Sequence, residues 1–394
     1  MTTAWARFDD LVSGRALRCP PPHRVVVAEA AEDVAPVLAE VERASAAGDW
    51  AYGYVSYEAA AGLDPSLAVT PPAADGPPLV WFGLCDQPAE VPPVTPLLDS
   101  PAAAEWVADW TSEEHASAVA SVREQIAAGT TYQCNLTDRL RAHVVGDPLT
   151  FYTGLALAQR SAHSAYLDLG RHVVASASPE LFFEWAGDLL RTRPMAGTAA
   201  RGRTEDDDAR AAHRLRTNSK ERAENLMIVD LLRNDLSRVA RTGTVDVPSL
   251  FTVEGYPTVW QLTSTITART RDDVGLVDVF RALFPCGSVT GAPKASTMRL
   301  IRDLEQSPRG VYCGAIGLVA PPGSPFRARF NVAIRTAVLD RTSGAAVYGA
   351  GGGITWDSDP VAERAELLAK AAVLVAGPGA PGHHDRATTA ARPG

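Results

Sequence analysis

Lysine is almost absent from this chain. The 394 residues contain three lysines, Lys220, Lys294 and Lys370, among 37 basic side chains. The compact ammonium group of lysine offers three donors that a planar guanidinium does not reproduce. Each lysine also lies in a segment that is marked by glycine or glutamate. We therefore expect the lysines to mark a functional site, against the alternative that three residues fell there by chance.

Other scarce features exclude several classes of protein. Net charge is −9 and no basic stripe is present, so a nucleic acid is not an expected partner. No apolar run approaches the roughly 18 residues of a membrane span, and the N-terminus has no apolar core of signal length. The five cysteines are scattered and form no CxxC pair, which argues against a zinc ribbon or a disulfide framework. These absences predict a cytoplasmic protein with reduced thiols and no membrane partner.

Composition divides the chain into three parts. Residues 1–100 are expected to form an N-terminal lobe that ends in a connector, since residues 71–101 contain nine prolines. Residues 112–376 are expected to form the main catalytic domain. Residues 377–394, which are rich in glycine and proline, are expected to be a disordered tail.

Strand patterns and long helices alternate in the main domain. Strands are predicted at His172–Ala177, Leu181–Trp185 and Leu189–Arg193, and a further pair at Arg329–Leu339 and Ala345–Gly349. Short turns join several of these strands, so the strands should pair mostly antiparallel. The predicted fold class is therefore α+β, without the regular alternation of a doubly wound sheet.

A carboxylate cluster lies on one predicted helix near the C-terminus. Asp359 followed by Pro360 is a good helix start, and Glu363, Glu366 and Lys370 then fall within roughly 60° of one face. Two carboxylates beside an ammonium suit a magnesium site with an anionic ligand next to it, because Mg²⁺ prefers carboxylate oxygen. A surface ladder of ion pairs is the alternative.

Further polar residues lie in a second helix and in glycine-rich turns. The helix that starts at Ser219 carries Glu224 among apolar residues. The runs Gly349–Gly353 and Pro285–Lys294 allow backbone N–H groups to approach an anion, although neither has the spacing of a nucleotide-binding motif. Glu180, between two predicted strands, is either a general acid or an exposed turn carboxylate.

Six segments, taken in order, resemble the chorismate-utilising enzymes, a family that includes the large subunits of anthranilate synthase and aminodeoxychorismate synthase, and the isochorismate and salicylate synthases. The resemblance covers about residues 112–375, with a weaker match in the N-terminal lobe. The segments are YQCNLT (132–137), SASPELF (176–182), TRPMAGT (192–198), SKERAENLMIVDLLRND (219–235), FPCGSVTGAPK (284–294) and GGGITWDSDPVAERAELLAK (351–370).

This resemblance implies a fold of two packed, mostly antiparallel sheets flanked by helices, with the site between them. It implies that Glu224 and Glu366 hold Mg²⁺, with Glu363 in or near the next layer of contacts, and that Glu180 acts as general acid. The implied substrate-binding residues are Tyr312, Arg335, Lys370, Gly351, Gly352, Gly353, Thr290 and Gly291. Thr198 and Lys294 are expected at the pocket with the catalytic groups. Arg335 is also expected on a strand face opposite its apolar neighbours.

Two positions separate the chemistries within the family. By the resemblance, Gln133 occupies the position at which isochorismate and salicylate synthases have a lysine that activates water. A glutamine cannot act as that base, so amination is implied instead of hydroxylation. By the resemblance, Ala196 occupies the position at which the better-known aminodeoxychorismate synthases have a lysine that is thought to attack the ring. Anthranilate synthases have alanine at this position, as this chain does. Asn225 points the other way, because anthranilate-type enzymes usually have histidine at that position.

The resemblance therefore implies magnesium-dependent amination of chorismate to 4-amino-4-deoxychorismate, in p-aminobenzoate and folate synthesis or in a specialised pathway. The sequence contains no glutaminase machinery, so ammonia is expected from a glutamine amidotransferase subunit or from solution. The alternatives are an anthranilate synthase or 2-amino-2-deoxyisochorismate synthase component I, and a non-catalytic relative that binds chorismate for regulation.

Overall fold

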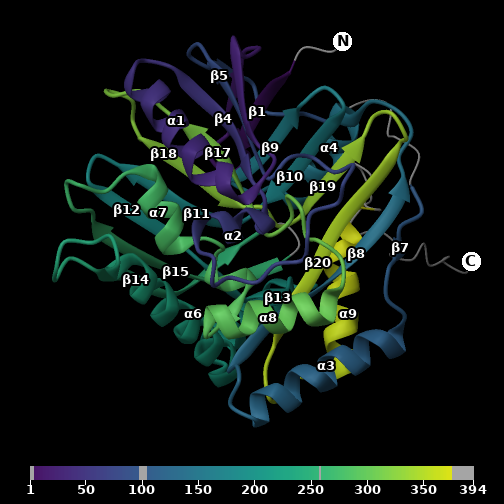
Figure 1. The fold of residues 1–394 in the computed structure, drawn as a ribbon. Helices are drawn as coiled ribbons and strands as arrows, with labels where there is room; N and C mark the ends of the chain where they lie inside the picture. The colour runs from purple at the N-terminus through teal and green to yellow at the C-terminus, as the bar shows by residue number, and fades with distance from the viewer. Residues whose placement is uncertain (1–3, 97–103, 257–258, 375–394) are drawn as a thin grey trace, which may run out of the picture.

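Two large antiparallel sheets form the framework of the protein (Figure 1). The computed structural model describes residues 4–96, 104–256 and 259–374. In these residues each sheet has ten strands, and every hydrogen-bonded pair within the sheets is antiparallel. This arrangement confirms the predicted α+β class. The predicted tail, residues 377–394, lies outside the described residues.

The strands of the first sheet run in the order β16 (Gly291–Ala292), β8 (Gln133–His143), β20 (Ala345–Ile354), β19 (Thr336–Asp340), β10 (His172–Ser178), β9 (His163–Asp168), β1 (Trp5–Asp10), β2 (Arg15–Cys19) and β6 (Ala89–Val91), with β7 (Val107–Ala108) paired to β8. Those of the second run in the order β13 (Met195–Ala200), β15 (Val259–Arg269), β12 (Leu189–Arg193), β11 (Leu181–Ala186), β18 (Ala328–Val332), β17 (Ala315–Val319), β4 (Trp50–Val55), β5 (Val80–Cys85) and β3 (Arg24–Ala28), with β14 (Asp246–Gly255) paired to β15.

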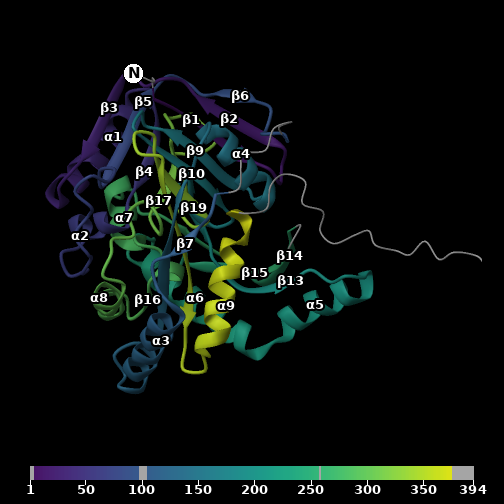
Figure 2. The ribbon, with the colours of Figure 1, turned by 90° about the vertical axis from the view of Figure 1, so that its right-hand side faces the viewer.

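Helices flank the two sheets (Figures 1 and 2). They are α1 (Val34–Ala46), α2 (Ala60–Leu63), α3 (Ser112–Ala127), α4 (Pro148–Gln159), α5 (Glu205–Thr217), α6 (Ser219–Ser237), α7 (Leu276–Leu283), α8 (Lys294–Glu305) and α9 (Pro360–Ala371). Helix α6 packs on β13 and β15, and α9 packs on β20. Across the described residues, no helix combines the length and the apolar character needed to cross a bilayer.

The predicted N-terminal lobe contributes strands to both sheets. Strands β1, β2 and β6 extend the first sheet, while β3, β4 and β5 extend the second. Between these two extensions lies an aromatic core that includes the buried side chains of Tyr52, Tyr54 and Trp81. Since apolar burial contributes about 25 cal/mol per Å², this core helps to hold the two sheets face to face.

The predicted hairpin of β11 and β12 is confirmed, but the strand expected at Arg329–Leu339 is two strands. Its first half, β18, pairs with β11 in the second sheet, and its second half, β19, pairs with β10 and β20 in the first. The chain passes between the sheets at residues 333–335. Arg335 therefore does not lie on a strand face, and it has a left-handed backbone with φ of 52°.

A buried ion cluster joins β8 to the end of α8. Glu305 forms ion pairs with Arg139 and Arg309, and the side chains of all three residues are at most 2% exposed. Glu305 also accepts hydrogen bonds from the backbone N–H and the hydroxyl of Thr137, both at 2.9 Å. Full partnering of this kind is what makes buried charges tolerable in a medium of low dielectric.

We predict that Arg309→Met lowers the free energy of unfolding by about 3–5 kcal/mol, because it leaves part of the Glu305 charge buried without its partner. Urea denaturation would measure the change. Arg302→Met is the control: Arg302 lies on α8, is exposed and forms an ion pair with the neighbouring Asp303. Its cost should stay below about 1 kcal/mol. Equal costs for the two variants would contradict a structural role of the cluster.

Candidate active site

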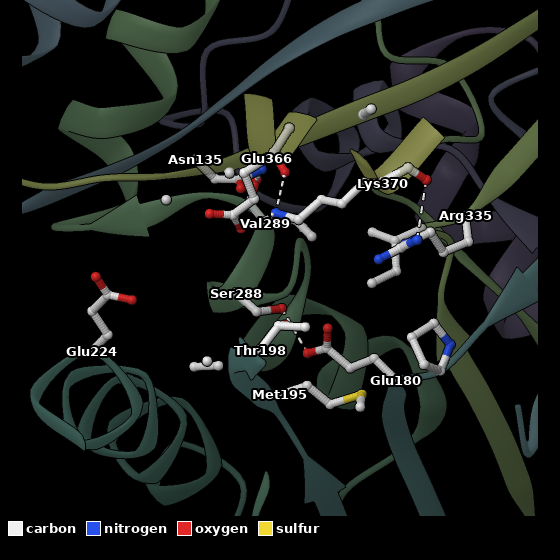
Figure 3. A pocket seen from close by; sticks show the side chains of 18 of the residues that line it. Asn135, Glu180, Met195, Thr198, Glu224, Ser288, Val289, Arg335, Glu366 and Lys370 are labelled. Atoms are coloured by element: carbon white, nitrogen blue, oxygen red, sulfur yellow. Dashed lines mark hydrogen bonds and ion pairs between the residues drawn. The ribbon is translucent and has the colours of Figure 1, made fainter. Parts of the chain in front are cut away.

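One pocket of about 200 Å³ contains most of the side chains that the sequence analysis singled out. Its walls come from both sheets, since residues of β8 and β20 face residues of β13 and β15. Helices α6 and α9 supply the remaining polar side chains (Figure 3). The pocket therefore exists only because the two sheets pack together.

The glycines of β20 let large side chains lie directly against this strand. A Cβ atom at Gly349 would overlap the ring of Tyr312, and one at Gly353 would overlap the amide of Gln133. A Cβ at Gly351 would meet the carbonyl oxygen of Leu136 on the neighbouring β8. Glycine is thus required for close packing here, and it brings Tyr312 and Gln133 into the pocket wall.

The side chain of Arg335 is held at the last turn of α9, next to the backbone of Lys370. The guanidinium of Arg335 donates to the backbone carbonyl of Lys370 at 3.1 Å, and the hydroxyl of Tyr348 donates to the same oxygen at 3.1 Å. Donors at this position satisfy a carbonyl that the helix leaves without a partner at its C-terminal end. The bonds hold Arg335 beside Lys370, and both side chains line the pocket.

The ammonium group of Lys370 lies between strand β20 and helix α9. It donates to the carbonyl oxygen of Gly351 at 2.7 Å and forms an ion pair with Glu366 at 2.8 Å. Figure 3 shows the Lys370 side chain extended across one wall of the pocket toward Glu366. An anionic ligand in the pocket would therefore meet two cations, Arg335 and Lys370, from one side.

Carboxylates line the pocket from two helices. Glu221 and Glu224 come from α6, and Glu363 and Glu366 come from α9. Glu363 accepts a hydrogen bond from the hydroxyl of Ser358 at 2.7 Å. Figure 3 shows Glu224 and Glu366 on different sides of the same open space.

This donor set fits Mg²⁺, which commonly takes one or two protein carboxylates and completes its shell with water and ligand oxygens. Among the described residues, no group of three or more histidine, cysteine, aspartate or glutamate side chains is already gathered as a complete metal site. The carboxylates that could hold the ion are Glu224, Glu363 and Glu366.

Glu180 is a buried acid in the pocket wall. It follows β10, is 2% exposed, and accepts a hydrogen bond from the hydroxyl of Ser288 at 2.7 Å. Burial raises the pKa of Glu180 to about 7, although the bonds from Ser288 and from the Met195 backbone oppose the shift. A carboxyl with this pKa can both give and take a proton near neutral pH.

Three positions that bear on the type of chemistry also line the pocket. Gln133 is 6% exposed and Ala196 is 9% exposed, so both lie in the wall itself. Thr198 points toward the pocket in Figure 3, and its hydroxyl donates to the side-chain oxygen of Gln261 at 3.1 Å. Tyr312, Arg335, Gly351, Gly352, Gly353 and Lys370 complete the set of predicted site residues that the structure brings together.

Lys294, Thr290 and Gly291 do not line the pocket, contrary to expectation. The Lys294 ammonium forms an ion pair with Asp235 of α6 at 2.9 Å and donates to the carbonyl of Leu283 at 3.2 Å. Thr290 is fully buried and donates to the carbonyl of Cys286 at 3.1 Å, while Gly291 pairs with Cys134 in β8. These residues fix the segment that carries Ser288.

The expectation that the lysines mark the site therefore holds for one of them. Lys370 lines the pocket, Lys294 lies behind its wall, and the side chain of Lys220 lies outside what the structure describes. Sequence reasoning did not single out several lining residues, which are Asn135, Met195, Glu221, Gln261, Ser288, Ile334 and Tyr348. Asn135, Met195, Glu221 and Ser288 lie within the segments quoted above, but a segment does not show which of its side chains face inward.

The chorismate binding enzyme family matches residues 90–376 of this chain. Aminodeoxychorismate synthase component 1 of Escherichia coli (strain K12) is 38% identical over 276 residues, which are 70% of this chain and 60% of that protein. Anthranilate synthase component 1 of Aquifex aeolicus (strain VF5) is 39% identical over 271 residues, 68% of this chain and 54% of that protein. The chain thus spans 60% or less of the length of these curated relatives.

The fold has a solved counterpart. Anthranilate synthase component I from Streptococcus pneumoniae TIGR4 superposes with a TM-score of 0.80 at 25% sequence identity, covering 92% of each chain. This likeness confirms the predicted architecture of two packed sheets with flanking helices.

We predict that Glu180→Gln makes the free energy of unfolding less dependent on pH. A carboxyl whose pKa rises on folding from 4.5 to about 7 stabilises the folded state below pH 4.5, and this contribution is lost as the pH rises through about 7. An amide cannot ionise, so the variant should lose less stability than the wild type between these values. Urea denaturation at several pH values measures the difference.

The control for this measurement is Glu124→Gln, at an exposed position on α3. It should leave the pH dependence as in the wild type. Identical slopes for the wild type and Glu180→Gln would show that Glu180 is not a protonated buried acid.

Proposed function

The chain belongs to the chorismate-binding enzymes, and from this we propose that its pocket binds chorismate and exchanges a hydroxyl group of the ring for an amino group. The single observation that carries the proposal is the composition of the pocket. A buried carboxyl with a pKa of about 7 (Glu180) shares the pocket with two cations and with carboxylates from two helices. Chorismate is a dicarboxylate with a ring hydroxyl, and each of its groups has a matching partner in this set.

Arg335 and Lys370 are proposed to bind the carboxylates of the substrate. The guanidinium offers a planar pair of donors, while the ammonium acts as a point charge beside it. Both are already oriented, because Arg335 is bonded to the carbonyl of Lys370 and Lys370 to that of Gly351. Tyr312 and the backbone of Gly351–Gly353 form the adjoining wall.

Glu180 is proposed to move the proton that the exchange requires. In its neutral form it gives a proton to the departing hydroxyl, which leaves as water as the C–O bond breaks. Ammonia forms the new C–N bond, and the ammonium that results returns a proton to the Glu180 carboxylate. Protonation of Glu180 is therefore restored at the end of the cycle, and its pKa near neutrality suits both directions.

Magnesium is proposed as the cofactor, held by Glu224 and Glu366 with Glu363 beside them. When bound, Mg²⁺ neutralises a substrate carboxylate and polarises its oxygens. The carboxylates of α6 and α9 would hold the ion, and Glu366 also forms an ion pair with Lys370, one of the two substrate-binding cations.

We propose C4 as the position of amination, which gives 4-amino-4-deoxychorismate. Several relatives named aminodeoxychorismate synthase support this choice, at 38–44% identity. Asn225 supports it as well, because the family resemblance implies histidine at this position in anthranilate-type enzymes; in this chain Asn225 is fully buried and accepts a hydrogen bond from Ser264 at 2.6 Å. Ala196 in the pocket wall favours the second candidate, an anthranilate synthase, whose relatives match at a similar identity.

A glutamine amidotransferase subunit is proposed as the source of ammonia, because relatives of this chain are named as a first component. A regulatory relative without turnover is disfavoured, since the pocket keeps both a protonatable acid and a set of carboxylates. We further propose that the product enters p-aminobenzoate synthesis or a specialised aromatic pathway.

Incubation of the protein with chorismate, Mg²⁺ and ammonium salt should give 4-amino-4-deoxychorismate, identified by chromatography and mass spectrometry. Ala196→Lys, measured in parallel, places an amine in the pocket wall and should keep amination at C4. Anthranilate or a C2-amino compound as the main product of the wild type would contradict the proposed position. No conversion of chorismate would contradict the activity itself.

Glu366→Gln should lower Mg²⁺ affinity and magnesium-dependent turnover by about 100-fold or more, since removal of groups that only support a metal ligand already costs about 10–100-fold. Isothermal titration with Mg²⁺ and initial rates at several Mg²⁺ concentrations measure the two effects. Glu124→Gln is the control. Unchanged Mg²⁺ binding and activity in Glu366→Gln would refute the metal assignment.

A further inference from the structure

We propose that Ser288 is a positioning residue for Glu180, holding its carboxyl so that one chosen oxygen carries the proton delivered to the substrate. This inference rests on the proposed role of Glu180 as proton donor. Ser288 lies in the short turn Gly287–Val289, between α7 and α8, and its side chain reaches Glu180 across the pocket wall (Figure 3).

The hydrogen bond has a defined direction. The Ser288 hydroxyl lies 2.7 Å from Oε1 of Glu180 and 3.3 Å from Sγ of Cys286. Burial raises the pKa of Cys286 to about 12, so its sulfur stays a thiol and is a weak acceptor. The shorter contact and the better acceptor favour donation of the single hydroxyl hydrogen to Oε1, which leaves Oε2 to carry the proton of neutral Glu180.

The segment that carries Ser288 is fixed on its C-terminal side. The Lys294 ammonium anchors its C-terminal end to Asp235 of α6. The guanidinium of Arg309 donates to the carbonyl of Val289 at 2.6 Å, and the backbone N–H of Asn135 donates to that of Thr290 at 2.8 Å. Ser288 thus presents its hydroxyl from a rigid support, as a group must if it is to orient another.

This arrangement also explains why Lys294 lies behind the pocket wall. Its ammonium is largely buried and reaches both Asp235 of α6 and the carbonyl of Leu283, which lies just before the segment. Lys294 supports the segment from behind, while Ser288 contacts Glu180 from the front. The effect of Lys294 on the reaction is therefore indirect.

Other titratable groups face the same space and must be held constant in a test. The Cys286 thiol lies 4.0 Å from Oε1 of Glu180. The remaining ionisable groups of the pocket wall come from the β18–β19 connection, β20, α6, α9 and the segment before Cys313. They are Arg335, Tyr348, Glu221, Glu224, Glu363, Glu366, Lys370 and Tyr312.

The test is the pH dependence of Ser288→Ala, with Ser288→Cys as a second variant that keeps the size of the side chain. Loss of the donor destabilises ionised Glu180, so the pKa of Glu180 should rise by about one unit. The alkaline limb of the kcat profile should move to higher pH by the same amount. Because the proton is less well oriented, kcat should fall about 10-fold while KM for chorismate stays unchanged.

Ser288→Thr keeps the hydroxyl and should restore the limb. Ser296→Ala is the control, since Ser296 bonds to the carbonyl of Thr130 on the outer side of α8. The proposal would be overturned if the alkaline limb of the kcat profile stayed at the wild-type pH in both Ser288→Ala and Ser288→Cys. Equal changes in kcat and KM would also overturn it.

A measurement without substrate separates this inference from the proposed function. ¹³C NMR of protein labelled at glutamate carboxyls, with the Glu180 signal assigned by its loss in Glu180→Gln, reports the Glu180 pKa directly. A rise in Ser288→Ala supports the link even if chorismate proves not to be the substrate. An unchanged Glu180 pKa overturns the link even if chorismate is converted.

Discussion

The pocket depends on one buried charge cluster, in which Glu305 binds Arg139 and Arg309. Arg309 also donates to the carbonyls of Val289 and Asn135, at 2.6 and 2.8 Å, and Arg139 lies over the ring of Tyr312. A cluster at the end of α8 thus fixes strand β8, the segment that carries Ser288, and Tyr312 together. Because buried charges must keep all their partners, these three parts of the wall cannot move independently.

A second constraint is that neither sheet holds the chemistry alone. The first sheet supplies the glycines of β20 and Gln133 of β8, while the second supplies Ala196 and Thr198 of β13. Glu180 lies in the connection that leads from β10 in the first sheet to β11 in the second. The packing of apolar side chains between the sheets therefore sets the spacing between the acid and the cations.

The features that could be predicted from the sequence are those that depend on a local residue pattern or on a motif shared with the family. Helix α9 begins at Pro360 as expected, and the spacing of Glu363, Glu366 and Lys370 was sufficient to place all three in one pocket. The division of Arg329–Leu339 between two sheets was not predictable in this way. A continuous alternating pattern does not reveal that its two halves pair with different partners, because pairing depends on strands far away in the chain.

Long-range contacts also decided the roles of single residues. Lys294 was expected in the pocket because its segment resembles others that contribute to such sites, yet its length and flexibility allow it to reach Asp235 instead. Ser288 carried no signal of its own, since a serine in a glycine-rich turn is common. Its importance follows only from the position of Glu180, a residue more than a hundred positions earlier in the chain.

The passage of the chain between the sheets at residues 333–335 is a covalent link beside the pocket. It joins β18 of one sheet directly to β19 of the other, at the end of the pocket where Arg335 and Lys370 lie. Figure 3 shows Glu224 at the opposite end. Arg335 is bonded to the carbonyl of Lys370 at this end, and α9 packs on β20 of the first sheet, so the two cations are tied to each other and to the same sheet. The carboxylates of α6 and α9 belong to helices on different sheets, because α6 packs on β13 and β15. The span between those carboxylates therefore depends on how the two sheets pack, while the separation of the cations does not.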